Sequence, residues 1–142
     1  MIHTLLFQNQ PRRSQTGQSL TELALMLPVL MLILVGTLDL GRLLDAYVVM
    51  SNAAREGVRY AIDYPTSTDA IKNRALQEAT SGGSRYNDLT SSMITVSGQT
   101  SDGVGGNYIT VSINYPFSLI TTYLFAGLDT IPVHTSASMQ VR

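Results

Sequence analysis

The sequence contains no cysteine and few charged residues. Of its 142 residues, 13% are charged and 44% are hydrophobic, whereas an ordinary soluble domain carries about 25% charged residues. Without cysteine there is no disulfide framework, no thiolate metal site and no cysteine nucleophile. A domain of this kind must be stabilised by its own core or by packing against other subunits.

Basic clusters and enzyme motifs are also missing. Nine basic residues balance ten acidic ones, and beyond Arg12-Arg13 no stretch gathers basic residues, so nothing favours nucleic-acid binding. The two histidines, His3 and His134, cannot form a His-Glu-x-x-His zinc site, and no Gly-x-Ser-x-Gly elbow is present. The glycines of residues 103–106 indicate a turn, because no Lys-Ser/Thr follows them. The sequence predicts no enzyme and no catalytic, cofactor or metal residue.

The longest apolar run predicts a single transmembrane helix. Residues 23–38 carry no charge, and extension to residues 20–40 gives about 30 Å of helix, enough to cross a bilayer. Glu22 and Asp39 should then lie near the two interfaces. Arg12 and Arg13 precede the run without an acidic residue, which predicts a cytoplasmic N-terminus. We therefore expect a leader at 1–17, a transmembrane helix at 18–40 and an exported head at 41–142.

A cleaved secretory signal is the alternative interpretation of the same run. It requires small residues at a cleavage site directly after the apolar segment. The sequence there is Gly36-Thr-Leu-Asp-Leu-Gly-Arg42, with bulky leucines and charges at those places. The sequence therefore favours a retained helix over ordinary signal cleavage.

Helical periodicity continues past the apolar run. Apolar or small residues recur in steps of three and four up to Pro65, predicting one helix over about residues 20–64 whose second part, 41–64, belongs to the head. The predicted core stripe comprises Leu40, Leu44, Tyr47, Ser51, Ala54, Val58 and Ala61. Arg55, Glu56 and Arg59 fall largely off the stripe. We expect a solvated face there, with Glu56 able to pair with Arg59, and a subunit contact as a second interpretation.

The remaining residues predict an α+β head with a small antiparallel sheet. Thr68-Asp69 should begin a helix that runs through Ala79 and ends at Gly82-Gly83. Strands are expected at 93–97, at 108–115 with Pro116 ending it, and at 131–141. Residues 101–107 should form a turn-rich loop, and 117–128 a loop or a short helix. The apolar face of the sheet should pack on the long helix.

A glycine and a carboxylate at a defined spacing precede the apolar run. In Gly17-Gln-Ser-Leu-Thr-Glu22, cleavage after Gly17 would make Gln18 the new N-terminus and Glu22 the fifth residue, which is the type IV prepilin pattern. An isolated carboxylate in lipid costs at least about 2.5 kcal/mol, so Glu22 needs a partner. In pilin-type filaments this partner is the terminal amine of a neighbouring subunit. The simpler interpretation is that Glu22 only marks the membrane interface.

Three stretches resemble one known family. The segment from Gly17 to Leu30, Gly36-Thr-Leu-Asp-Leu-Gly-Arg42 and Asn52-Ala-Ala-Arg-Glu-Gly-Val-Arg-Tyr-Ala61 are similar to the TadE-like family of tight-adherence (Flp) pilus systems. The resemblance implies a bacterial pseudopilin or minor pilin that supports surface attachment. Its implied partners are a prepilin peptidase, other pilin subunits, the pilus assembly machinery and membrane lipid. Leu23 departs from the tyrosine that processed members often carry after the glutamate.

Two classes of function follow from these patterns. In the first, the chain is a pilus assembly subunit that is processed after Gly17, resides in the bacterial cytoplasmic membrane with its head outside, and can enter an extracellular pilus. In the second, the chain is an uncleaved single-pass anchor whose head binds a partner or the cell envelope. The spacing of Gly17 and Glu22 favours the first class, because a retained anchor does not need it.

Overall fold

The structure is a computed structural model that describes residues 15–101, 107–123 and 130–141. The chain divides into two compact units, Met1–Leu34 and Val35–Arg142, which we describe separately. Helix α1 (Gln15–Asp63) has 49 residues and contributes to both. The prediction of one long helix is confirmed, although it begins at Gln15 rather than near residue 20. His3, Arg12 and Arg13 lie outside the described residues.

In the first unit, the described residues belong to α1. This helix is long and apolar enough to cross a membrane by length and composition, and Pro28 lies within it without ending it. Its large apolar side chains, Leu25 and Ile33 among them, are exposed in the isolated chain. A helix that is apolar on its exposed sides is typical of a membrane span.

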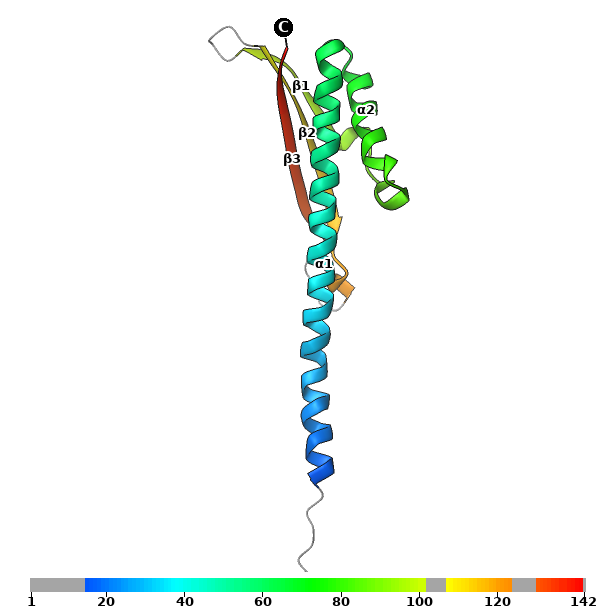
Figure 1. The fold of residues 1–142 in the computed structure, drawn as a ribbon, viewed down its shortest axis with the longest axis vertical. Helices are drawn as coiled ribbons and strands as arrows, with labels where there is room; N and C mark the ends of the chain where they lie inside the picture. Colours follow the sequence, from blue (N-terminus) through cyan, green and yellow to red (C-terminus); the bar gives the residue numbers. More distant parts are fainter. Residues whose placement is uncertain (1–14, 102–106, 124–129, 142) are drawn as a thin grey trace, which may run out of the picture. The chain divides into compact units, whose positions relative to one another are not determined.

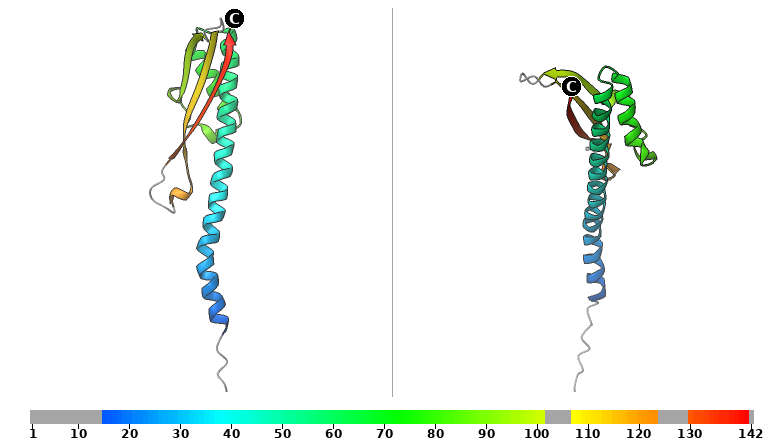
Figure 2. Two further views of the ribbon diagram at one scale, coloured as in Figure 1. Left: turned by 90° about the vertical axis from the view of Figure 1, so that its left-hand side faces the viewer. Right: turned by 45° about the horizontal axis from the view of Figure 1, so that its top comes forward.

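The second unit, which we call the head, has the predicted α+β fold. Strands β1 (Ile94–Ser101), β2 (Asn107–Ser118) and β3 (Thr130–Val141) form an antiparallel sheet in the order β1-β2-β3. Helix α2 (Thr68–Ser81) and the second half of α1 lie along this sheet (Figures 1 and 2). Short 3-10 helices η1 (Ser84–Tyr86), η2 (Ser91–Met93) and η3 (Thr121–Tyr123) connect the elements.

The core of the head lies where the two helices meet the sheet. Alternate residues of β2 are buried, as expected for a strand with one covered face. Gly57 of α1 marks the closest approach, since a Cβ atom there would lie 3.1 Å from Ala75 Cβ and 3.4 Å from Val111 Cγ1. Small residues of α1 therefore let both α2 and β2 approach the helix. The main core residues are Ala46, Met50, Ala53, Val58, Ala61, Ile71, Ala75, Ile94, Ile109, Val111, Ile113 and Phe117.

The predicted core stripe of α1 is wrong in its first half. Ala54, Val58 and Ala61 are buried as expected, and Ser51 is half-buried. However, Leu40, Leu44 and Tyr47 are exposed, while Asp39, Ala46 and Met50 are buried in their place. The prediction equated hydrophobicity with burial. Directly after the apolar run, α1 carries large apolar residues on its exposed side as well, and small residues such as Ala46 mark the packed side.

The predicted end of the central strand is also wrong. Strand β2 continues through Pro116 to Ser118, with Pro116 opposite Pro132 of β3. The pairing with β1 reaches only to Ile113, so among the described residues no strand is paired with β2 on that side at Pro116. A proline, which has no N–H, is tolerated at such an edge position. Residues 102–106 of the first predicted loop and 124–128 of the second lie outside the described residues.

Candidate functional site

The predicted processing residues lie together at the start of α1. Gly17, Gln18 and Glu22 are helical and exposed. The side-chain amide of Gln18 donates a hydrogen bond of 3.0 Å to Glu22 Oε1, one helical turn along. The Thr21 hydroxyl donates to the carbonyl of Gln18 at 2.7 Å. Gln18 and Glu22 therefore share one face of the helix, and the carboxylate projects outward from it.

Asp39 forms the most buried polar centre of the head, which sequence reasoning missed. The residue is 3% exposed. Its two carboxylate oxygens accept hydrogen bonds from the backbone N–H groups of Ile120 and Thr121, each at 2.8 Å. Hydrogen bonds of backbone donors to a carboxylate are among the strong ones in proteins. Asp39 thus fastens the segment after β2 to α1, and it does not simply mark a membrane interface as predicted.

Arg42 completes this centre on the next turn of α1. Its Nη1 donates to Asp39 Oδ1 at 3.1 Å, and its guanidinium lies 5.0 Å from the centroid of the Phe117 ring. The same Nη1 lies 3.5 Å from the Ser118 carbonyl oxygen. A local signal was present, because Asp39 and Arg42 are three residues apart directly after the apolar run. Nothing local indicated that their partners would come from the end of β2.

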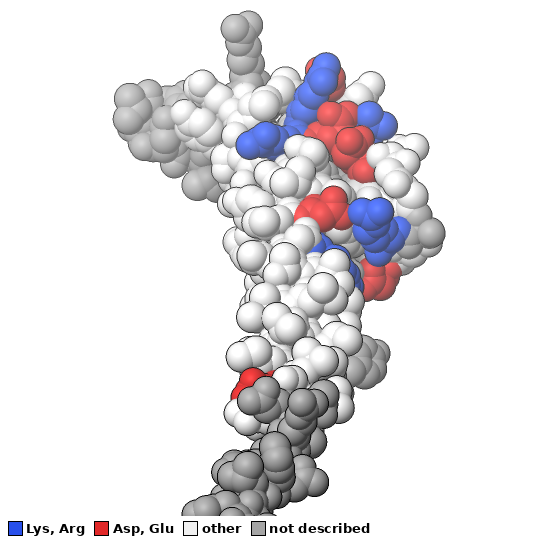
Figure 3. Space-filling view, turned by 60° about the horizontal axis from the view of Figure 1, so that its bottom comes forward, with Lys and Arg blue, Asp and Glu red and all other residues white. Residues whose placement is uncertain are grey.

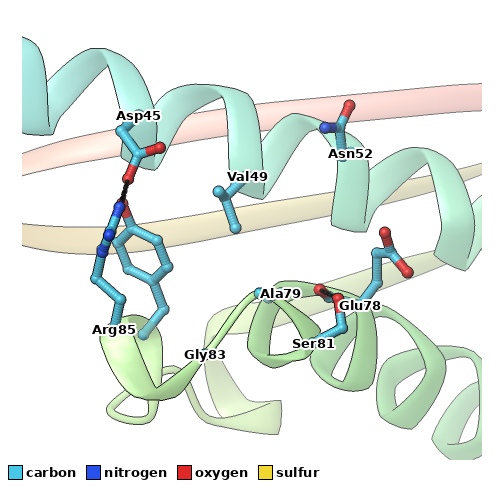
Figure 4. A pocket seen from close by; sticks show the side chains of 10 residues that line it. Asp45, Val49, Asn52, Glu78, Ala79, Ser81, Gly83 and Arg85 are labelled. Atoms are coloured by element: carbon cyan, nitrogen blue, oxygen red, sulfur yellow. Dashed lines mark hydrogen bonds and ion pairs between the residues drawn. The ribbon is translucent and has the colours of Figure 1, made fainter.

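A second network of polar side chains links α1 to η1 and the sheet. Asp45 accepts hydrogen bonds from Arg85 Nη1 at 2.8 Å and from the Tyr86 hydroxyl at 2.7 Å (Figure 4). The Tyr86 ring meets the Tyr115 ring edge-on, with centroids 5.8 Å apart, and the Tyr115 hydroxyl donates to both oxygens of Asp88. Burial and the hydrogen bond to Asp45 raise the pKa of Tyr86 to about 12. Burial and Asp88 likewise raise the pKa of Tyr115.

The predicted pair between Glu56 and Arg59 is not formed. Glu56 instead accepts hydrogen bonds from Arg74 of α2, at 2.7 Å from Nη2 and 3.1 Å from Nε. A two-pronged pair from another helix displaces the weaker pair along α1. Arg55 and Arg59 are exposed and form no ion pair with any residue described in the structure. Figure 3 shows that the surface of the head carries basic and acidic side chains close together.

The hollow between α1 and the end of α2 does not have the composition of an active site. Asp45, Asn52, Glu78 and Arg85 line it (Figure 4), and Asp45 and Arg85 are occupied by each other. His134 is exposed on β3 and does not line this hollow. Within residues 15–101, 107–123 and 130–141, no three His, Asp or Glu side chains gather as a metal site would require. The arrangement is suited to holding elements together.

Comparison with known proteins identifies one family. Residues 17–59 match the family model described as TadE-like protein. The matched stretch begins at the predicted processing glycine, passes through Asp39 and Arg42, and ends at Arg59. Comparison with curated proteins and with solved structures gave no match. The family match supports a general role in tight-adherence pilus assembly. Over residues 17–59, the chain is similar to the TadE-like family, as the resemblance predicted.

Proposed function

We propose that this chain is a pseudopilin or minor pilin of a tight-adherence pilus. In this proposal a prepilin peptidase cleaves between Gly17 and Gln18, and residues 18–40 hold the processed subunit in the bacterial cytoplasmic membrane. The head then lies outside the membrane, and the subunit supports pilus assembly and surface attachment. The observation that carries the proposal is Glu22, an exposed carboxylate on an otherwise apolar helix surface, five residues after Gly17 within the family match.

The chemistry of the proposal concerns the charge of Glu22. In the present chain, this carboxylate accepts a hydrogen bond from the Gln18 amide. Cleavage after Gly17 creates a positively charged α-amine on Gln18. When apolar helices of several subunits pack together, a carboxylate without a cation is costly, and pairing with the amine of a neighbour removes that cost. The pair also fixes the axial position of one subunit against the next.

The exposed arginines of the head supply a second contact in this proposal. Arg55 and Arg59 lie beside Ser136 and Met139 of β3 along a shallow groove. Both are accessible to acidic groups of another subunit. Glu56 acts differently, because its bond to Arg74 makes it a positioning residue for α2. Substituting Glu56 should therefore weaken the head itself, whereas substituting Arg55 or Arg59 should weaken assembly at unchanged stability.

The test compares Glu22→Ala, Glu22→Gln and the parent chain. Removing the carboxylate makes membrane insertion easier, so the amount of protein in the membrane fraction should not fall. Loss of one member of a buried pair costs about 3–5 kcal/mol, which weakens an assembly contact more than a hundredfold. The amount of pili recovered by shearing and the level of surface attachment should therefore be strongly reduced for Glu22→Ala and intermediate for Glu22→Gln. Normal attachment of Glu22→Ala at the parental protein level would contradict the pairing mechanism.

Processing is measured separately by intact mass of membrane-extracted protein. Cleavage after Gly17 leaves 142 − 17 = 125 residues beginning with Gln18. A mass that still contains residues 1–17 would favour the uncleaved anchor. Protease added to spheroplasts tests the orientation, because an exported head is digested beyond residue 64 and an internal head is protected.

A further inference from the structure

One edge of the sheet in the head lies open along its whole length. The strand order is β1-β2-β3, so β3 pairs with β2 on one side, and no described strand pairs with its other side. On that side, alternate residues of β3 direct their N–H and C=O groups away from the sheet. A row of unpaired backbone groups of this kind is a template for another extended chain.

The last part of β3 lacks the features that ordinarily block a sheet edge. Residues 134–141 include no proline and no Asp, Glu, Lys or Arg, and their register with β2 continues without a bulge. The opposite edge is different, because β1 has a register shift between Ser97 and Thr100 and also contacts α2. The edge of β3 is therefore the better of the two for adding a strand.

A groove between α1 and β3 follows this edge. Four consecutive residues of β3, 136–139, line it together with residues of α1 that include Arg55 and Arg59. Successive side chains of a strand point to opposite faces of a sheet, so a hollow over one face would be lined by alternate residues. Lining by four residues in a row indicates that the groove runs along the side of the strand. Figures 1 and 2 both show β3 next to the second half of α1.

The charges around the groove favour an acidic partner. Arg55 and Arg59 are exposed and form no ion pair within the described parts of the chain. Two carboxylates, Glu56 and Glu78, also line the groove, but Glu56 is bound by Arg74. With Arg74 counted, three guanidinium groups face two carboxylates, which leaves an excess of positive charge. Carboxylates are the side chains that guanidinium groups bind best.

A second copy of this chain fits the edge less well. Two β3 strands paired antiparallel would be related by a two-fold axis perpendicular to the sheet, which places both copies of α1 on one face. Each copy would then bring its own Arg55 and Arg59 toward the shared edge. Like charges on neighbouring strands are destabilising.

We propose that the edge of β3 binds an extended, acidic segment of a partner protein, which adds a fourth strand to the sheet. The main chain of the segment forms hydrogen bonds with β3, and its acidic side chains on the α1 side bind Arg55 and Arg59. This inference rests on the head contact contained in the proposed function and names the chemistry of its partner. It does not depend on cleavage at Gly17 or on the charge of Glu22.

Binding of short peptides to the full-length chain in detergent micelles tests the inference. The acidic probe is a peptide of about eight residues in which aspartate alternates with threonine, so that its carboxylates share one face of the added strand. A probe with lysine in place of aspartate tests the charge. An acidic probe methylated at its backbone nitrogens tests the main-chain pairing, because it cannot donate hydrogen bonds to β3. Calorimetry gives the affinity, and amide hydrogen exchange locates the bound probe.

The acidic probe should bind and should slow exchange of the outward amides in residues 134–141 about tenfold or more, while residues 94–97 of β1 keep their rates. The lysine probe should bind about tenfold more weakly, and the methylated probe should not slow exchange in β3. Arg55→Ala combined with Arg59→Ala should weaken binding of the acidic probe about fivefold. Lys72→Ala is the matched control, because it removes a cation of α2 that does not line the groove, and it should leave the affinity unchanged.

Three results would overturn the inference: no binding of the acidic probe, binding without slower exchange in β3, or equal binding of the lysine probe. Protection of β3 that rises with protein concentration in the absence of a probe would show that a second copy occupies the edge, which also overturns it. Each of these results leaves the pairing of Glu22 intact, since surface attachment of Glu22→Ala measures that pairing separately. Unchanged circular dichroism confirms that the arginine variants are folded.

Discussion

Replacement of Asp39 by alanine should release the segment after β2 without unfolding the sheet. The change removes the acceptor of the Ile120 and Thr121 N–H groups and the partner of Arg42. Hydrogen bonds to a charged group contribute about 1.5–3 kcal/mol each. The low end applies here, since Ile120 is partly exposed and water can replace some of the lost contact. The ion pair adds little, because the Arg42 side chain is 46% exposed.

Two bonds at the low end give about 3 kcal/mol, which raises the equilibrium population of the open form of this segment more than a hundredfold. Amide hydrogen exchange of the full-length chain in detergent micelles measures this directly, because protection is resolved residue by residue. Exchange at Ile120 and Thr121 should accelerate by that factor, with a smaller effect in the centre of β2. Asp39→Asn keeps one acceptor oxygen and should give an intermediate increase in amide exchange. Asp63→Ala, at the exposed end of the same helix, is the control and should leave exchange at both amides unchanged. Unchanged protection of both amides in Asp39→Ala would refute the role assigned to this carboxylate.

Three further predictions concern the packing and titration of the head. Gly57→Ala should destabilise the full-length chain by about 1 kcal/mol in urea, because overpacking against Ala75 outweighs the gain in helix propensity. Combined with Ala75→Gly, which itself costs about 1 kcal/mol of helix propensity, it should cost less than the sum of the two single changes. A stabilised Gly57→Ala variant would contradict the close approach. Because the pKa of Tyr86 is raised, its contribution to the free energy of unfolding should be constant below about pH 10 and should be lost as the pH rises toward about 12. In an absorbance titration, Tyr86→Phe should remove this late tyrosinate step. Thr135→Val should be neutral or stabilising in the same urea assay, because the buried Thr135 hydroxyl has no hydrogen-bond partner among the described residues. A decrease in the free energy of unfolding of more than about 1 kcal/mol would contradict this.

Local patterns were sufficient to predict the elements of this chain. The apolar run, the absence of a strong breaker before Pro65 and the glycines at 82 and 83 gave α1 and α2 to within a few residues. Alternation of apolar residues gave the three strands. Each signal lies within the segment that it describes, so no knowledge of the remaining chain was needed.

The polar centres could not be predicted in the same way, because their partners are distant in sequence. Asp39 binds N–H groups 81 and 82 residues further along, and Glu56 binds Arg74, 18 residues away. The sequence therefore did not predict the partners of Asp39, and it predicted a pair of Glu56 with Arg59 in place of Arg74. The side of α1 that faces the sheet could not be predicted for a related reason. Leucine is favourable both in a core and in lipid, so the sequence does not distinguish the two sides.

If α1 spans a membrane as proposed, the position of Asp39, Arg42 and Asp45 explains how one helix would pass from lipid to water without a break. A ring of charges around α1 would fix the membrane boundary at one level on all sides. Instead, these three charges are bound by partners within the head, so that a membrane around α1 would have its boundary near residue 39 on this side. On the outer side the surface stays apolar to Val48, and charge returns at Arg55. In the proposed function, an assembling subunit would therefore be able to move along its helix axis by several ångströms without carrying an unpaired charge into lipid, because the charges would travel with their partners.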